Sequence, residues 1–308
     1  MSFLYKADPA RGAEWRQLFS AKAPDILFRV WPDVGDPAAV RYLAAWEPPQ
    51  TLAASFPNLE VLFSVGAGVD QFDASTVPAH VPIVRMVEPG IISGMVEYVT
   101  LAVLTLHRDL VTYLAQQKTR TWQQIRVIPA ARRRVGVLGL GVLGQAVLAQ
   151  LSMLGFSCAG WSRSQHHIDG IACFAGAETL DAFLARTDIL VCLLPLTAQT
   201  RGFLDKGLFA KLPQGAALVN AGRGGHLVEA DLVEALAEGG LSAAVLDVAE
   251  REPLPSDHPF WGHPRIILTP HIASMTQPET AVDVVIDNIR RHHAGEPLKG
   301  LVDRARGY

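Results

Sequence analysis

Cysteine is scarce in this chain, whose 308 residues include three: Cys158, Cys173 and Cys192. They lie in apolar stretches without C-x-x-C spacing, so the sequence predicts buried reduced thiols rather than a disulfide framework. The histidines likewise show no zinc-ligand spacing, and we expect no metal site. Reduced thiols are typical of a cytoplasmic protein, which is the location we expect.

An excess of charge of one sign is also lacking. The chain has 27 lysines and arginines against 30 aspartates and glutamates, a formal net charge of −3. This balance provides no electrostatic attraction to nucleic acid or to an anionic membrane, and we expect neither as a partner. We expect the run Arg132–Arg134 to be a solvated approach to a strand.

Long hydrophobic runs are missing too. The N-terminus has no signal-peptide pattern, and no segment reaches the roughly 18 uncharged apolar residues of a membrane span. Hydrophobic residues make up 49% of the chain, charged residues 19% and aromatic residues 7%. The length and composition predict a soluble globular protein with enough core for two domains.

One glycine-rich stretch organises what is present. Val135–Leu138 predicts a buried strand, Gln145–Leu154 predicts a helix, and Gly139, Gly141 and Gly144 form the pattern G-x-G-x-x-G. The three glycines permit a tight turn, close approach to a pyrophosphate, and packing of helix on strand, respectively. The helix N-terminus offers N–H groups and partial positive charge to phosphates. Such loops also occur as plain turns, but this context favours dinucleotide binding.

The next predicted strand, Ser157–Trp161, bears on which dinucleotide is bound. An acidic residue at its end, about 20 residues after the loop, would bond the ribose 2′-hydroxyl of NAD. Here the strand continues into Ser162, Arg163 and Ser164. A guanidinium beside a hydroxyl suits a 2′-phosphate, although an exposed arginine at a strand end is also ordinary. We predict that NADPH is preferred, with NADH possible.

The rest of the chain predicts two α/β units. In the first, we expect a helix over Ala13–Phe19 and strands at Phe3–Lys6, Ile26–Val30, Tyr42–Trp46 and Val61–Val65. A glycine pair follows the fourth strand, where backbone amides can bind an anion or simply form a turn. We expect one long helix from Met95 to Trp122, linking the units or packing on another subunit. In the second unit, further strands are predicted at Ile189–Leu194, Ala216–Asn220, Ala243–Asp247 and Ile266–Thr269, giving a parallel doubly wound sheet.

Three polar side chains follow the last three of these strands. Arg223, Glu252 and His271 therefore come where ligands bind in open parallel sheets. They could serve as anion clamp, orienting carboxylate and general acid. Each also has an ordinary alternative, as a surface ion pair, a solvated carboxylate or a capping residue, and spacing alone leaves both possibilities open.

The sequence resembles the D-isomer-specific 2-hydroxyacid dehydrogenases, most closely their glyoxylate/hydroxypyruvate reductase branch. The resemblance covers essentially the whole chain and is carried by Trp46-Glu-Pro-Pro, Gly66–Asp70, Trp161-Ser-Arg, Arg251–Pro255 and Val302–Tyr308. It implies two Rossmann/flavodoxin-like doubly wound domains and a homodimer. Residues 99–283 would form the dinucleotide-binding domain, inserted in a substrate-binding domain of residues 1–98 plus 284–308.

The resemblance also implies residue roles. His271 would protonate the keto oxygen while a hydride moves from the nicotinamide, Glu252 would orient the imidazole and keep it protonated, and Arg223 would clamp the substrate. Leu143 and Gly144 would contact the pyrophosphate, Pro195 the cofactor cleft and Asp247 the nicotinamide side, while the amides of Val65, Gly66 and Ala67 would bind the carboxylate beside Trp46. One departure stands out: Gly222 occupies the family's usual alanine before the arginine.

These features predict NADPH-dependent reduction of small 2-oxoacids, glyoxylate to glycolate and hydroxypyruvate to D-glycerate. Two alternatives stay open. One is an NAD-linked dehydrogenase of a larger D-2-hydroxy acid, which Ser162-Arg163 disfavours. The other is a dinucleotide-sensing binding module, which would need a surface for a peptide partner.

Overall fold

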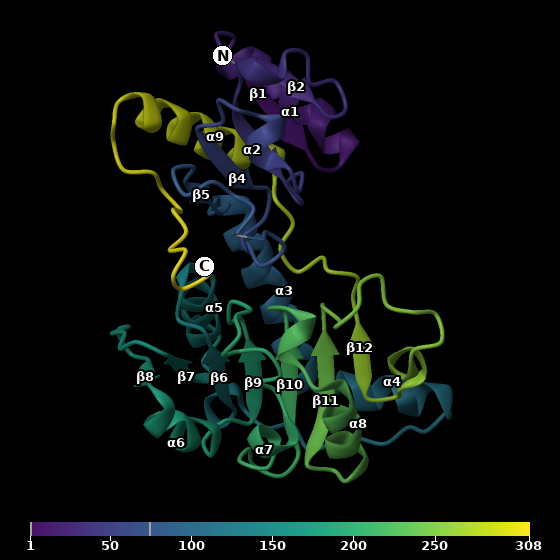
Figure 1. Cartoon of the computed structure of the whole chain (residues 1–308). Helices are drawn as coiled ribbons and strands as arrows, with labels where there is room; N and C mark the ends of the chain where they lie inside the picture. Colours follow the sequence, from purple (N-terminus) through teal and green to yellow (C-terminus); the bar gives the residue numbers. More distant parts are fainter. Residues whose placement is uncertain (1, 74) are drawn as a thin grey trace. The chain divides into compact units, whose positions relative to one another are not determined.

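The structure is a computed structural model that describes residues 2–73 and 75–308. It divides into two compact units (Figure 1): unit 1 comprises Met1–Ile91 and Met275–Tyr308, and unit 2 comprises Ile92–Ser274. Unit 2 is thus an insertion in unit 1. Unit 1 ends at residue 91 and resumes after residue 274, whereas the sequence led us to expect the divisions after residues 98 and 283. The first division falls within the first turn of a helix that begins at Pro89.

Unit 1 is built on a five-stranded parallel sheet in the order β2-β1-β3-β4-β5. Its elements are β1 (Ser2–Lys6), α1 (Pro9–Lys22), β2 (Leu27–Val30), β3 (Val40–Ala45), α2 (Leu52–Ser55), β4 (Val61–Ser64), β5 (Ile83–Val84) and α9 (Pro278–His293). This is the flavodoxin-like strand order. The four predicted strands are present, whereas β5 has only two residues and is too short to show a periodicity.

Both faces of this sheet are buried, as expected for a parallel sheet covered by helices. Successive side chains of a strand point to opposite faces. Phe3 therefore packs on Phe19 of α1, with ring centroids 4.9 Å apart. Its neighbour Leu4 joins a separate core cluster with Leu43 and Leu62. This alternation explains why the strands of unit 1 are continuous apolar runs.

Unit 2 carries a seven-stranded parallel sheet in the order β12-β11-β10-β9-β6-β7-β8. Its strands are β6 (Arg134–Leu138), β7 (Ser157–Ser162), β8 (Ala172–Ala175), β9 (Ile189–Cys192), β10 (Ala216–Asn220), β11 (Leu241–Leu246) and β12 (Ile266–Leu268), and its helices include α5 (Val142–Met153), α6 (Leu180–Leu184), α7 (Lys206–Phe209) and α8 (Glu229–Ala237). The predicted doubly wound parallel architecture is confirmed. After β8 the chain returns to the other side of β6, so the point where strand order reverses lies between β6 and β9.

The single long helix predicted from Met95 to Trp122 is wrong. The structure has α3 (Pro89–His107) and α4 (Leu110–Lys118) instead. They are separated at Asp109, whose φ of 53° lies in the left-handed region that aspartate tolerates better than most residues. One such residue ends a helix without disturbing the apolar periodicity on which the prediction relied.

Helix α3 bears on whether any segment could cross a membrane. It contains Glu97, so it does not contradict the expectation that no segment reaches roughly 18 uncharged apolar residues. By length and composition it could cross a membrane, and it is the one such helix in the described part of the chain. Its Val99, Val103 and Leu106 are buried in the core of unit 2. A core helix of a globular protein passes the same test.

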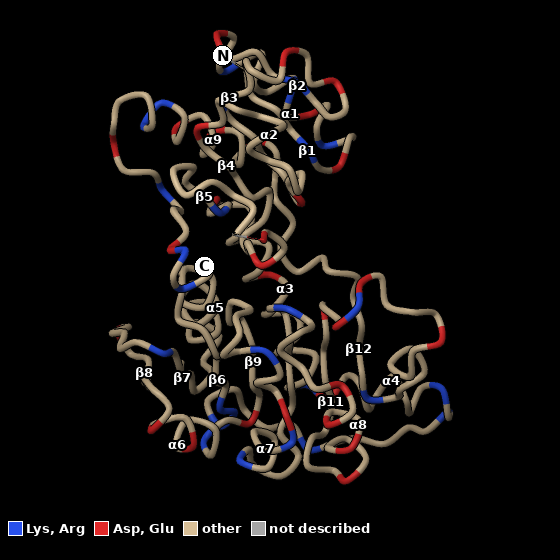
Figure 2. The backbone as a smooth tube through the Cα atoms, in the orientation of Figure 1, with Lys and Arg blue, Asp and Glu red and all other residues tan. Residues whose placement is uncertain are grey.

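Figure 2 shows that basic and acidic residues are interspersed along the chain in each unit.

Candidate active site

The glycine-rich loop lies at the carboxyl end of β6, beside the point where strand order reverses. Gly139 has a φ of +105°, and its N–H donates to the carbonyl oxygen of Trp161 on β7 at 2.8 Å. A methyl group here would also lie 2.7 Å from the Leu193 carbonyl after β9. The loop is therefore fitted between its two neighbouring strands, and only glycine satisfies both constraints.

The other two glycines differ sharply in their surroundings. Gly141 caps α5, and a Cβ built on it meets nothing within 4 Å. A Cβ on Gly144 would lie 1.8 Å from the Gly139 carbonyl oxygen. Open space above Gly141, at the N-terminus of a twelve-residue helix, fits the pyrophosphate of a dinucleotide. Leu143 lies in the first turn of this helix.

The predicted cofactor-selecting residues at the end of β7 differ in their exposure to solvent. Ser162 is buried, and its hydroxyl donates to the carbonyl oxygen of Ser164 at 2.6 Å. Arg163 and Ser164 are exposed. Arg163 and Ser164 are therefore the residues of this stretch with solvent-facing donors. Pro195, after β9, is half-buried, and its carbonyl accepts from the Thr200 hydroxyl at 2.7 Å.

The loop after β10 places Arg223. Buried Asn220 spans the turn: its Nδ2 donates to the Arg223 carbonyl at 3.1 Å, and its Oδ1 accepts from Gly222 N at 3.3 Å. The Arg223 N–H donates to Nδ1 of His226, which is fully buried, also at 3.1 Å. A Cβ on Gly222 would lie 3.1 Å from the same ring atom. The His226 imidazole therefore fills the space that an alanine side chain at position 222 would need.

A second glycine brings this loop against the loop after β11. A Cβ on Gly224 would lie 1.8 Å from the Ala249 carbonyl oxygen, so the two backbones touch. The Ala249 N–H in turn donates to Oε1 of Glu252 at 3.1 Å. Arg223 and Glu252 are thereby held on adjoining loops at one edge of the sheet.

Glu252 and His271 form the central pair of unit 2. Glu252 Oε2 lies 2.7 Å from His271 Nδ1, and the two side chains are 38% and 32% exposed. Burial acts to raise the pKa of Glu252, but the hydrogen bonds from His271 and Ala249 and the charges of His271 and Arg223 outweigh it, so the pKa lies below its ordinary value. Because an ionised carboxylate only accepts hydrogen bonds, Nδ1 is the donor. The second ring nitrogen is then the one that can hold or deliver a proton.

The turn carrying His271 is anchored on Asp247. His271 has a φ of 56°, and its N–H donates to the Asp247 carbonyl at 2.8 Å. The Asp247 carboxylate, 1% exposed, accepts from Ile272 N, from Ala273 N and from the Thr269 hydroxyl. Neither Thr269 nor buried His226 was singled out from the sequence, because no motif spacing marks them.

Unit 1 contains the second group of predicted residues, at the carboxyl ends of adjacent strands β3 and β4. The Val65 N–H donates to Ala45 O at 3.2 Å, and the Gly66 N–H to the Ser64 hydroxyl at 3.2 Å. Across residues 2–73 and 75–308, Ala67 is the one of the three predicted amides without such a partner. Half-exposed Trp46 lies alongside, since a Cβ on Gly66 would be 3.3 Å from its ring.

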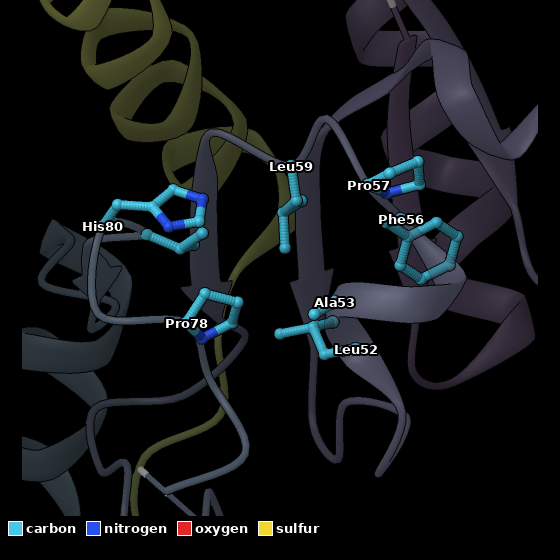
Figure 3. Close-up of a pocket in the computed structure, with 8 residues that line it drawn as sticks. Leu52, Ala53, Phe56, Pro57, Leu59, Pro78 and His80 are labelled. Carbon is cyan, nitrogen blue, oxygen red and sulfur yellow. The ribbon is translucent and has the colours of Figure 1, made fainter.

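A small pocket elsewhere in unit 1 contains none of the predicted residues (Figure 3). It has a volume of about 30 Å³ and is lined by Leu52, Ala53, Phe56, Pro57, Leu59, Pro78, His80 and Val81. A space of this size holds a water molecule or two rather than a substrate.

A glycine-rich loop at the reversal point of a parallel sheet, with arginine, carboxylate and histidine at strand ends of the same sheet, defines the class of dinucleotide-dependent α/β proteins. Residues 100–273 match the family described as "D-isomer specific 2-hydroxyacid dehydrogenase, NAD binding domain". The chain belongs to the D-isomer-specific 2-hydroxyacid dehydrogenases.

Relatives with names and solved structures cover the whole chain. A glyoxylate/hydroxypyruvate reductase A from Yersinia enterocolitica is 42% identical over 301 residues, which is 96% of either chain. A D-isomer-specific 2-hydroxyacid dehydrogenase from Xanthobacter autotrophicus, solved with NADPH and MES, is 39% identical with a TM-score of 0.95 and covers 100% of this chain and 99% of its own. An NADPH-dependent glyoxylate/hydroxypyruvate reductase from Sinorhizobium meliloti, solved with NADP and sulfate, is 36% identical with a TM-score of 0.93 and the same coverage.

Proposed function

We propose that the protein is a cytoplasmic NADPH-dependent reductase of small 2-oxoacids, converting glyoxylate to glycolate and hydroxypyruvate to D-glycerate. The observation that carries this proposal is the pairing of His271 with an ionised Glu252 2.7 Å away, on a loop held against the one that carries Arg223. Relatives of the whole chain are named for that reaction.

His271 is the proton donor of this mechanism. Glu252 accepts a hydrogen bond from the Nδ1–H of the ring, which fixes the ring's orientation. The other ring nitrogen then delivers a proton to the substrate's keto oxygen. Bound NADPH supplies the hydride that goes to the keto carbon. After turnover the ring regains its proton from solvent, to which it is about one-third exposed.

Arg223 binds the substrate before the proton moves. Its planar guanidinium donates two parallel hydrogen bonds, a geometry that matches the carboxylate and neighbouring keto oxygen of a 2-oxoacid. Its charge also stabilises the negative charge that develops on the keto oxygen. In unit 1, the Ala67 N–H is the predicted amide best able to donate to the carboxylate, with Trp46 as an apolar neighbour.

The preference for NADPH rests on Arg163 and Ser164. Both are exposed at the end of β7, and no acidic residue stands at this position to bond a 2′-hydroxyl. An arginine provides charge-assisted hydrogen bonds to a 2′-phosphate. The remaining cofactor contacts would come from Leu143, Gly144, Pro195 and Asp247. Two similar structures were solved with NADPH or NADP, which supports the same cofactor here.

The protein acts as a homodimer in this proposal. Apolar side chains from α3, from α4 and from the segment that follows α4 face solvent in the single chain: Leu101, Leu104, Leu110, Leu114, Trp122, Val127 and Ile128. Trp122 is fully exposed, at 100%. Large apolar residues gathered on one stretch of chain mark a protein–protein contact, and sedimentation of the purified protein measures it directly.

One assay tests the function. Oxidation of NADPH and of NADH is followed with glyoxylate, hydroxypyruvate, pyruvate and phenylpyruvate. We expect the highest kcat/KM with NADPH and one of the first two acids. A preference for NADH with a larger acid would instead identify a D-2-hydroxyacid dehydrogenase of the NAD-linked type. Binding of dinucleotide without turnover of any acid would identify a sensing module and contradict the proposal.

A further inference from the structure

The turn that presents His271 has an unusual backbone. His271 is one of three described residues other than glycine with a positive φ, and the other two lie beside α4. A Cβ makes this conformation unfavourable, so it persists only where surrounding contacts fix it. At a proton-donating histidine, the contacts that fix the backbone also decide where the ring points.

Three successive N–H groups supply those contacts, and each donates to Asp247. The His271 N–H is shared with the Thr269 carbonyl oxygen at 3.1 Å. His271 N donates to the Asp247 carbonyl at 2.8 Å, Ile272 N to its Oδ1 at 2.9 Å and Ala273 N to its Oδ2 at 2.8 Å. The consecutive amides of Ile272 and Ala273 both face the Asp247 carboxylate and form a nest, and a left-handed residue is part of that geometry. Asp247 is therefore the anchor of the turn.

Asp247 is itself held by a chain of two hydroxyls. Thr269 Oγ1 donates to Asp247 Oδ1 at 2.6 Å, and the Tyr98 hydroxyl lies 2.5 Å from Thr269 Oγ1. The direction of these bonds follows from the carboxylate, which accepts and does not donate when ionised. Since the Thr269 proton goes to Asp247, the Tyr98 hydroxyl must donate to Thr269.

Tyr98 is suited to remain a donor. It lies on α3, and burial raises its pKa to about 12, with the Thr269 bond acting in the opposite direction and the Asp247 charge adding to the rise. The hydroxyl therefore keeps its proton throughout the range in which the enzyme works. A partly buried chain with one possible direction of hydrogen bonding holds its members more tightly than isolated bonds would.

We propose that Tyr98, acting through Thr269 and Asp247, is a positioning residue that holds the His271 turn in the conformation in which the ring meets Glu252. This inference rests on the proposed function for its kinetic consequence but not for its structural one. In this proposal Tyr98 contacts neither substrate nor cofactor. It belongs neither to the glycine-rich loop nor to the residues at the strand ends.

The experiment removes the hydroxyls one at a time in the full-length protein. Tyr98→Phe and Thr269→Val each take away one hydroxyl with little change in shape, and Thr269→Ser keeps the hydroxyl. Tyr113→Phe is the matched control, because its hydroxyl is also hydrogen-bonded, accepting from Ile125 N at 2.9 Å, but lies outside this chain of bonds. Steady-state kinetics with NADPH and glyoxylate is combined with hydrogen exchange of the 269–275 segment.

We expect Tyr98→Phe and Thr269→Val each to lower kcat roughly 10-fold. Their KM values for NADPH and for glyoxylate should stay within about twofold of wild type, and so should kcat of the control variant Tyr113→Phe. Thr269→Ser should restore kcat. The double variant should be no slower than Thr269→Val, because Tyr98 reaches Asp247 only through Thr269. A merely structural role would lower thermal stability without this separation of kcat from KM.

Hydrogen exchange separates this inference from the proposed function. Faster exchange of the Ile272 and Ala273 amides in Tyr98→Phe, and unchanged exchange in Tyr113→Phe, supports the positioning role even if wild type turns over no keto acid. If wild type is active and Tyr98→Phe matches it in kcat, the inference is overturned. It is equally overturned if exchange in the segment is unaltered.

Discussion

The Cα of Gly144 lies so close to the carbonyl oxygen of Gly139 that a methyl group at position 144 would sit 1.8 Å from that oxygen. The first turn of α5 thus packs directly against Gly139, the residue that follows β6. Gly141, between them, has open space around its missing side chain. The protein's own packing therefore requires glycine at positions 139 and 144, whereas no protein atom requires it at position 141.

This difference gives opposite expectations for two alanine variants. Gly144→Ala must move α5 away from β6, and we expect it to lower the free energy of unfolding by about 3 kcal/mol. Gly141→Ala adopts an ordinary φ of −74° and meets no protein atom, so its stability should stay within about 0.5 kcal/mol of wild type. If the proposed phosphate site lies here, the added methyl group would occupy it, and we expect NADPH binding to weaken roughly 10-fold or more. Urea unfolding and fluorescence titration measure the two effects. Normal NADPH affinity in Gly141→Ala would contradict phosphate binding here.

Arg163 provides the test of cofactor selection. Arg163→Ala would remove the proposed charge-assisted hydrogen bonds to the 2′-phosphate, and it should reduce kcat/KM with NADPH about 10- to 100-fold while leaving kcat/KM with NADH almost unchanged. Arg290→Ala, at an exposed position on α9 of unit 1, is the control for loss of a surface charge. A variant at position 163 that keeps the wild-type ratio of the two cofactors would remove this residue from the selection.

Much of this site could be predicted from the sequence because its parts have local patterns. A strand, three glycines and a helix within twenty residues mark the loop, and Arg223, Glu252 and His271 each follow an apolar strand. Parallel strands place such residues at one edge, whatever their distance along the chain. Strand positions were predictable for the same reason, since a sheet buried on both faces requires apolar runs.

The parts that escaped prediction depend on single backbone angles or on contacts distant in sequence. The left-handed Asp109 divides a continuous apolar pattern into α3 and α4. Tyr98 meets Thr269 across 171 positions of the chain. The strand β8 (Ala172–Ala175) is half-buried at the sheet edge and lacks a strong apolar run. No local pattern carries this information.

The Arg223 clamp is tested by Arg223→Lys. A lysine keeps the positive charge but replaces a planar fork with a single flexible ammonium. We expect kcat/KM for glyoxylate to fall at least roughly 100-fold, as when two charge-assisted hydrogen bonds are lost. Affinity for NADPH, measured by fluorescence, should be unaffected and serves as the internal control. If kcat/KM stays within a few-fold of wild type, Arg223 does not bind the substrate in this way.

The Glu252–His271 pair has a defined pH dependence. Because the pKa of Glu252 lies below its ordinary value, the carboxylate stays ionised at and below pH 4.5, and its bond to His271 is lost only as the pH falls through the lowered pKa. Glu252→Gln removes the charge at every pH, and we expect kcat to fall about 10- to 100-fold. His271→Ala should lower kcat further, with little change in NADPH affinity. Equal kcat for wild type and Glu252→Gln at neutral pH would exclude the orienting role.

Asp188 gives a prediction about stability rather than catalysis. It lies just before β9, and its carboxylate accepts from the Arg134 backbone N–H at 2.9 Å and from two guanidinium nitrogens, the nearer at 2.5 Å. This pair ties the starts of β6 and β9 together, at the opposite end of β6 from the glycine-rich loop. Burial acts to raise the pKa of Asp188, but the three bonds and the charges of Arg134 and Arg133 outweigh it and hold the pKa below its ordinary value.

The sign of the pH effect follows from this lowered pKa. The unfolded chain binds a proton at Asp188 more readily than the folded chain does, so the stabilisation is complete above the ordinary pKa of 3.8 and is lost as the pH falls through the lower, folded value. At pH 7, Asp188→Asn should lower the free energy of unfolding by about 1–2 kcal/mol, since the Arg134 side chain is 40% exposed and solvent weakens the pair. The difference from wild type should shrink below about pH 4.

Urea unfolding of both proteins across this range measures the difference. Asp181→Asn is the matched control, because Asp181 pairs with Lys211 at 2.7 Å on the surface, where the side chains are 68% and 46% exposed. Such a pair contributes about 0–1 kcal/mol and should show little change. A loss of stability in Asp188→Asn that is the same at pH 7 and at pH 3 would show that shape, not charge, fixes the starts of the two strands.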